Sequence, residues 1–173
     1  MDIKDKVAAA IATLKPVCGE AAINGLMATG FEDLLATNGL DVGIHAPGGL
    51  YINAMKTGFY SGNQSELVVT DREVAVLAIL TVQGADANLA LHIFIALVSG
   101  MSVQHVLNVI LLAGMYSGAN LLSHAMKVAT KTFAAIIKAA ACPVTGPGDV
   151  FKIIAAEFPD VPFDAAKALA KKP

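Results

Sequence analysis

The sequence predicts an all-α fold, a bundle of about six to eight helices. Apolar residues recur at helical spacing along most of the chain, and no segment shows the clean apolar-polar alternation of a strand. Gly and Pro residues divide the chain into pieces of helix length. Because 173 residues are enough to bury one core, we expect a single domain over residues 1–173.

The N-terminal part begins with an Ala-rich amphipathic segment, which Pro16 should end or kink. Residues 38–49 resemble a loop, because they contain Asn38-Gly39 and Pro47-Gly48-Gly49. The helices expected in this part cover residues 3–14, 20–28, 31–37 and 50–57.

The helix signals become stronger from residue 70 onward. Thr70 and Glu73 have the spacing of a capping box, and Gly84 ends that helix. Asp86 and Ser102 are expected to cap the next two helices, and Gly100 is expected to end the first of these two. Residues 145–148 are expected to form a linker. The helices predicted here cover residues 70–82, 86–99, 102–116 and 120–140, followed by two short ones over 150–158 and 163–171.

The charge of the chain limits its partners. Its net charge is -2, and its basic residues are scattered, which argues against nucleic acid and against a polybasic membrane contact. Charged residues make up only 15% of the chain, against about 25% in an average soluble domain. Residues 87–126 contain no Asp, Glu, Lys or Arg, but polar and Gly residues interrupt their apolar blocks, which favours buried helices over membrane spans. We therefore expect a homo-oligomer that hides apolar surface between subunits.

The cysteines and histidines give no sign of a cofactor. Cys18 and Cys142 are far apart in the sequence and form neither a CxxC motif nor a metal-ligand cluster. They are expected to be reduced thiols of a cytoplasmic protein, since the N-terminus does not resemble a secretory signal. His45, His105 and His124 belong to no HxxEH or HExxH motif, so neither a metal ion nor another cofactor is expected.

The segment from Thr70 to about Met126 resembles the core of the carboxymuconolactone decarboxylase/AhpD-like superfamily. The matching features are Arg72-Glu73 at a helix start, Gly84, His92 in the next helix, then the strings ALVSGMS and MYSGA. The resemblance covers about a third of the chain, and the flanking segments match only in length and helicity. It implies a helical bundle that assembles as a trimer or hexamer, with sites near the subunit contacts.

The resemblance also implies where a site lies. In the thiol-peroxidase branch of the superfamily a Glu is followed by CxxCxxxH, and here the Glu and His fall on Glu73 and His92. The two cysteine positions fall on Ala85 and Asn88. Spacings of three and four place Ala85, Asn88 and His92 on one helix face. Neither Ala nor Asn forms a thiolate, so AhpD-type peroxidase chemistry is excluded at this site.

The sequence can also be compared with the decarboxylase branch of the superfamily, which likewise lacks the cysteine pair. The segment GADANLALH matches its Gly, Leu and His positions, but Asn88 replaces an expected acid and Ala85 an Arg that is often present. Both are expected to contact substrate, and Tyr116 of the MYSGA string is a further candidate. From the residues alone, apart from the resemblance, the alternative is that Glu73 only caps a helix and that His92 is only a hydrogen-bonded core residue.

Three functions follow as hypotheses. The first is an enzyme, lyase-like in type, that uses Glu73 and His92 as an acid-base pair on a small carbonyl, lactone or carboxylate substrate. The second is a non-catalytic protein of the same fold that binds a small ligand or only assembles. The third is a peroxidase-like antioxidant protein whose thiol chemistry has moved to Cys18 or Cys142.

Overall fold

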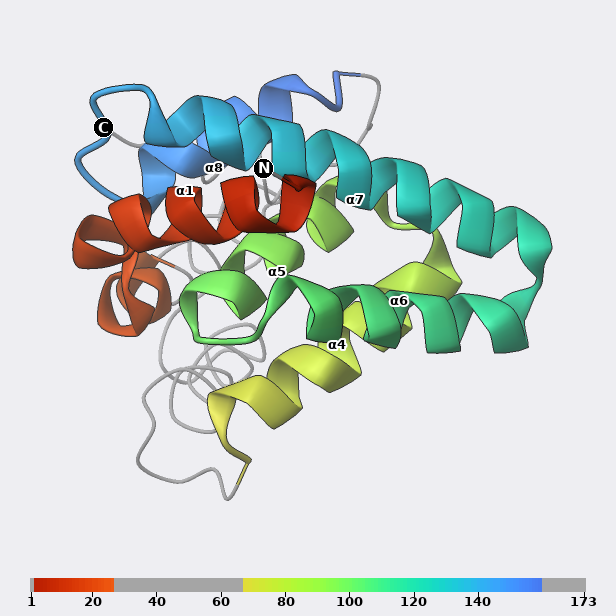
Figure 1. Ribbon diagram of the computed structural model, residues 1–173. Helices are drawn as coiled ribbons and strands as arrows, with labels where there is room; N and C mark the ends of the chain where they lie inside the picture. Colours follow the sequence, from red (N-terminus) through yellow and green to blue (C-terminus); the bar gives the residue numbers. More distant parts are fainter. Residues whose placement is uncertain (1, 27–66, 160–173) are drawn as a thin grey trace, which may run out of the picture.

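The computed structural model describes residues 2–26 and 67–159, and within them every regular element is a helix. This confirms the predicted all-α class. The predicted elements between residues 31 and 57, the predicted helix over 163–171, and His45 lie outside the described residues. Residues 20–26 are helical, in agreement with the prediction. The other helices, shown in Figure 1, are α1 (Ile3–Cys18), α4 (Val69–Gln83), α5 (Asp86–Val98), α6 (Val103–Ser117), α7 (Ala119–Ala140) and α8 (Pro147–Ala156).

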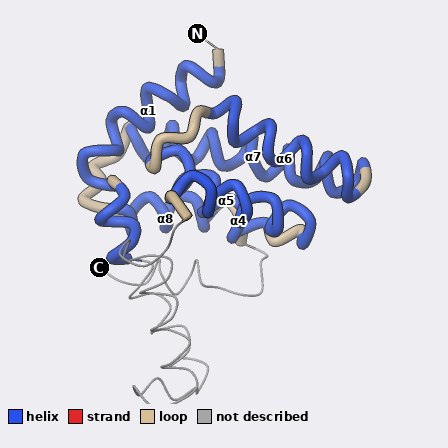
Figure 2. The backbone as a smooth tube through the Cα atoms, turned by 90° about the horizontal axis from the view of Figure 1, so that it is seen from below, coloured by secondary structure: helices blue, strands red, loops and turns tan. Residues whose placement is uncertain are grey.

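Helix α5 forms the centre of the bundle. Ten of its thirteen residues are buried, as expected for a helix that is apolar on all sides. It contacts the other five labelled helices: α7 and α8 lie above it in Figure 1, α4 and α6 below. The rings of Phe94 on α5 and Phe151 on α8 meet edge to face, with centroids 6.0 Å apart, a favoured aromatic geometry. Figure 2 shows that short loops connect each helix to the next in the series from α4 to α8.

The helix boundaries follow local signals at three predicted positions. Gly84 ends α4 in the left-handed conformation, with φ 63°, which glycine adopts without steric cost. Gly100 also has a positive φ, 105°, in the turn between α5 and α6. The Ser102 side chain caps α6, because its Oγ accepts a hydrogen bond from the His105 backbone N–H at 3.1 Å. These predictions are confirmed.

The predicted capping devices of α4 and α5 are wrong. Helix α4 begins at Val69, so Thr70 lies inside the helix and is not its cap. Glu73 is fully buried, and both its carboxylate oxygens contact other side chains. At α5 the N-cap is Ala85 without a side-chain hydrogen bond, and the first helical residue, Asp86, contacts His124 instead. In both cases the carboxylate that was predicted to cap a helix contacts a histidine of another helix instead, His92 for Glu73 and His124 for Asp86.

Two proline positions also differ from the prediction. The predicted end of the first helix at Pro16 is wrong, because α1 continues to Cys18, and the alternative of a kink at Pro16 stays a prediction. The predicted linker over residues 145–148 is partly helical, because α8 begins at Pro147. A proline is well tolerated at the first position of a helix, since its missing N–H has no intrahelical partner there and its φ is already helical.

None of the helices that the structure describes combines the length and the apolar character that crossing a membrane requires.

Candidate functional site

The site begins on the buried face of α4. Glu73, Leu77 and Thr81 follow one another at four-residue spacing along this face and are buried. Arg72 is also buried, with a side chain 7% exposed. An ionised carboxylate in such surroundings is strongly destabilised unless it has charged or hydrogen-bonded partners.

Glu73 has two such partners, one on each oxygen. The Arg72 Nε–H donates a hydrogen bond to Glu73 Oε1 over 3.0 Å. On the other oxygen, Nδ1 of His92 lies 2.8 Å from Oε2. Glu73 comes from α4 and His92 from α5, so the contact joins two helices whose shared turn is closed by Gly84.

The contact determines how the His92 ring can act. An ionised carboxylate has no hydrogen to donate, so Nδ1 of a neutral His92 must be the donor. The second nitrogen, Nε2, then carries a lone pair and can accept a proton. Nε2 makes no hydrogen bond to another described residue. The His92 side chain is 13% exposed, whereas Glu73 is fully buried, so the imidazole lies between the carboxylate and the edge of the core.

Ala85 and Asn88 lie on the same side of α5 as His92. These three residues are partly buried, whereas Ala87, Leu89 and the residues that flank His92 are buried. The structure therefore brings together the Glu73–His92 pair and the face that carries Ala85 and Asn88. Ala85 contributes a methyl group and Asn88 a neutral amide to this face.

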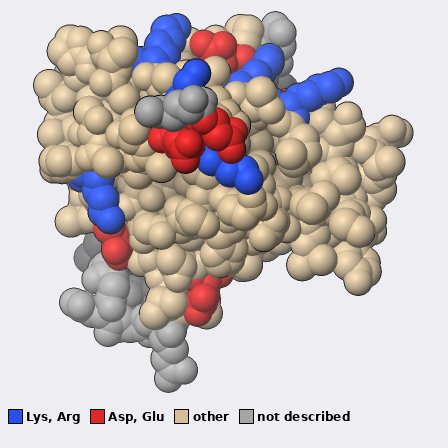
Figure 3. Space-filling view, in the orientation of Figure 1, with Lys and Arg blue, Asp and Glu red and all other residues tan. Residues whose placement is uncertain are grey.

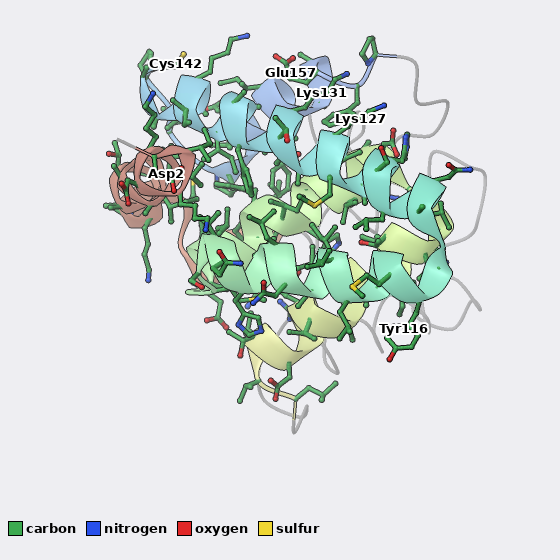
Figure 4. All side chains as sticks on the ribbon, turned by 45° about the vertical axis from the view of Figure 1, so that its right-hand side comes forward. Asp2, Tyr116, Lys127, Lys131, Cys142 and Glu157 are labelled. Atoms are coloured by element: carbon green, nitrogen blue, oxygen red, sulfur yellow. The ribbon has the colours of Figure 1, made fainter. Side chains whose placement is uncertain are left out.

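Tyr116 does not join these residues within one chain. It lies near the C-terminal end of α6, with its side chain 89% exposed. Figure 4 shows it at the outer end of the α6–α7 hairpin, pointing away from the bundle. A contact between Tyr116 and the site would require a second subunit.

A second histidine–carboxylate pair was not foreseen. His124 Nε2 on α7 lies 2.5 Å from Asp86 Oδ1 at the start of α5. This pair is more exposed than Glu73–His92, with side chains 50% and 25% exposed. The two residues are 38 positions apart and form no motif, so no local sequence signal could have found them.

The two cysteines have different surroundings, and both are free. Burial raises the pKa of Cys18 to about 11, and the negative charge of Asp149 adds to this effect. Cys142 is exposed on the opposite side of the molecule from Tyr116 (Figure 4). In the part of the chain that the structure describes, no three His, Cys, Asp or Glu side chains gather as a metal site would require.

Comparisons with known proteins give one match. No curated protein and no solved structure matches the chain. The model of the carboxymuconolactone decarboxylase family matches residues 50–131, which include Glu73, Ala85, Asn88, His92 and Tyr116. Residues 50–131 therefore belong to the carboxymuconolactone decarboxylase/AhpD-like superfamily, as a member without the CxxC motif.

Proposed function

We propose that the protein is an enzyme that moves a proton on a small carbonyl, lactone or carboxylate substrate, with His92 as the base. The observation that supports this most directly is the 2.8 Å contact between His92 Nδ1 and Glu73 Oε2. A carboxylate on Nδ1 fixes the tautomer and the orientation of the ring, and it stabilises the imidazolium that forms when Nε2 accepts a proton.

Arg72 contributes to the same arrangement. Its guanidinium compensates the charge of the buried Glu73 carboxylate in the resting state. When His92 takes a proton, Glu73 is already in place to stabilise the new positive charge, and no side chain needs to move. A positioned general base of this kind accelerates proton transfer by about 10²–10⁴-fold.

The remaining residues favour a neutral acceptor group in the substrate. Asn88 supplies amide N–H donors for a carbonyl oxygen, and Ala85 leaves room beside it. Neither residue supplies the charge that holds a substrate carboxylate in the decarboxylase branch. We therefore infer a substrate in which a carbonyl or lactone oxygen meets Asn88 and an acidic C–H meets His92.

The experiment is exchange of substrate protons with deuterated water, followed by NMR on a panel of small lactones, ketones and keto acids. His92→Gln should lower the exchange rate by about 10²–10⁴-fold. Glu73→Gln keeps the size of the side chain but removes its charge, and should also slow exchange. His124→Gln is the matched control, because it removes the other carboxylate-paired histidine. Exchange that survives His92→Gln unchanged would contradict the proposal.

We also propose that the protein works as a cytoplasmic homo-oligomer, a trimer or hexamer, through one face of α6. This face, called here the α6 apolar face, carries Leu111, Leu112, Met115 and Tyr116, all exposed. No Lys, Arg, Asp or Glu is visible at the outer end of the α6–α7 hairpin, whereas such residues gather over α1 and along α7 (Figure 3). Uncharged apolar patches of this kind are typical of subunit interfaces.

Light scattering tests the assembly. Leu112→Glu and Met115→Glu should lower the molar mass toward that of one chain, since a charge in an apolar interface is strongly unfavourable. Ile3→Glu is the control, because Ile3 is an exposed apolar residue on α1. A wild-type protein with the mass of one chain would contradict assembly.

A further inference from the structure

A groove lies between α1 and the turn that joins α5 to α6. Its volume is about 470 Å³, and it is open to solvent along one side. Ile11 of α1, Leu97 of α5 and Met101 and Val103 of the turn and α6 form its apolar floor. The volume falls in the range of small-molecule sites, about 300–1,000 Å³.

The groove is separate from the Glu73–His92 pair. Neither residue lines it. The groove meets α5 at Leu97, in the last turn of that helix, and the following turn at Gly100. A ligand in the groove would therefore not touch Glu73 or His92.

Two lysines stand on the rim of the groove, at opposite ends of its α1 wall. Lys4, Ala8, Ile11 and Lys15 follow each other at helical spacing, and Lys4 and Lys15 are about 16 Å apart along the helix axis. An elongated apolar floor between the two ends suits an extended chain better than a compact, polar ligand.

The two ends differ in charge. At the first end, the Lys4 ammonium donates a hydrogen bond to the Gln104 amide oxygen at 2.5 Å, and Asp5 on the same rim offsets its charge. At the second end, Lys15 is exposed and forms no ion pair with any residue that the structure describes. The positive potential of the groove is therefore concentrated at Lys15, which can receive an anion.

We propose that this groove binds a medium-chain aliphatic carboxylate. The carboxylate pairs with the Lys15 ammonium, and the chain lies on Ile11, Leu97 and Met101 toward Lys4. Burial of the chain supplies most of the affinity, because each methylene removed from water strengthens binding about fourfold. The ion pair at the solvent-exposed end sets the preference for an acid over a neutral molecule.

The test is titration calorimetry with decanoate below its micelle concentration and with decanol, its uncharged counterpart. Wild-type protein should bind decanoate about three to five times more tightly than decanol, as expected for one exposed ion pair. Lys15→Gln should weaken decanoate binding by about the same factor and leave decanol binding unchanged. Lys138→Gln is the control, because Lys138 is an exposed lysine on α7 that pairs with Glu157.

A second variant tests the apolar floor. Ala12→Phe places a large ring over the groove from an exposed position on α1, and it should abolish binding of both probes. Circular dichroism checks that the variant folds, and Lys15→Gln keeps the proposal testable if it does not. No decanoate binding to the wild type, or binding that neither substitution weakens, would overturn the proposal. A change of oligomeric state on substituting Ala12 would also overturn it, in favour of a second copy of the chain in the groove.

Discussion

Gly114 on α6 and Leu122 on α7 bring two helices into backbone contact. A Cβ atom added to Gly114 would lie 2.8 Å from the Cα of Leu122. Real atoms do not approach so closely, and the obstructing atom belongs to the backbone, which cannot rotate away. The α6–α7 hairpin, which presents the α6 apolar face, therefore depends on the absence of a side chain at Gly114.

The first prediction concerns this contact. Gly114→Ala should lower the free energy of unfolding by about 1–3 kcal/mol, because α6 and α7 must separate to admit the methyl group. Gly148→Ala is the matched control: a Cβ there meets nothing within 4 Å, and the residue is in α8. The control should gain about 0.4–1 kcal/mol from reduced chain entropy in the unfolded state. Chemical denaturation measures both, and equal effects would contradict the close packing of α6 on α7.

The second prediction concerns Cys18. The pKa of its thiol is raised from 9.0 to about 11 in the folded protein. Between pH 9 and 11 the Cys18 thiol ionises in the unfolded chain but stays neutral in the folded protein. The stability that the neutral thiol contributes is therefore complete below pH 9 and is lost as the pH rises to 11. Because one pKa unit corresponds to about 1.4 kcal/mol, the full loss is about 3 kcal/mol.

Denaturation at several pH values measures this loss. Cys18→Ala should flatten the decline of stability between pH 9 and 11, and Cys142→Ser should leave the decline as in the wild type. Thiol labelling of the folded protein at pH 8 should modify only Cys142, the exposed cysteine. Thiol-dependent peroxide consumption that survives Cys142→Ser would favour an antioxidant role for Cys18 and would contradict its burial as an inert thiol.

The third prediction concerns the start of α8. Asp149 Oδ2 accepts hydrogen bonds from the backbone N–H and from the hydroxyl of Thr145. These two bonds lower the pKa of the Asp149 carboxyl below 3.8. The ionised Asp149 carboxylate therefore stabilises the folded protein above pH 3.8, and this stabilisation is lost as the pH falls through the lowered pKa.

Asp149→Asn should cost about 0.3–1 kcal/mol at pH 7, because it keeps a hydrogen-bond acceptor but removes the negative charge from the first turn of α8. The difference from the wild type should shrink below pH 4. Thr145→Val removes only the hydroxyl donor, so it should have a smaller effect. Acid denaturation curves that remain parallel for wild type and Asp149→Asn would contradict this assignment.

Local signals in the sequence predicted the fold well where a single residue determines the backbone. Gly84 and Gly100 end or connect helices through their positive φ, and Ser102 caps α6 with its own side chain. The predictions failed where a partner distant in sequence competes for the same group. Thr70-Asp71-Arg72-Glu73 has the form of a capping box, but Glu73 is held by Arg72 and His92.

The site shows the same limit. The proximity of Glu73 and His92 could be expected only from the superfamily resemblance, since 19 positions separate them. The role of Arg72 as a partner of Glu73 was missed, although the two residues are adjacent, because neighbours in a helix do not normally face each other. The Asp86–His124 contact depends on how α7 packs on α5, which no local pattern encodes.

The last prediction uses the Arg72–Glu73 ion pair to separate stability from function. Glu73→Leu should lower the free energy of unfolding by about 3–5 kcal/mol, because it leaves the guanidinium and the His92 N–H buried without their carboxylate. Glu73→Gln should cost less, since its amide oxygen still accepts a hydrogen bond. Arg72→Met combined with Glu73→Leu should recover part of the loss, because a buried ion pair replaced by apolar residues is often tolerated.

Urea denaturation of the wild type, Arg72→Met, Glu73→Leu and the double variant gives the interaction energy between the two positions. The double variant is the informative one for function. If Glu73 and His92 form a catalytic pair, this variant is stable but does not exchange substrate protons. If the double variant is no more stable than Glu73→Leu alone, the carboxylate does not act mainly as the partner of Arg72, and His92 becomes its principal contact.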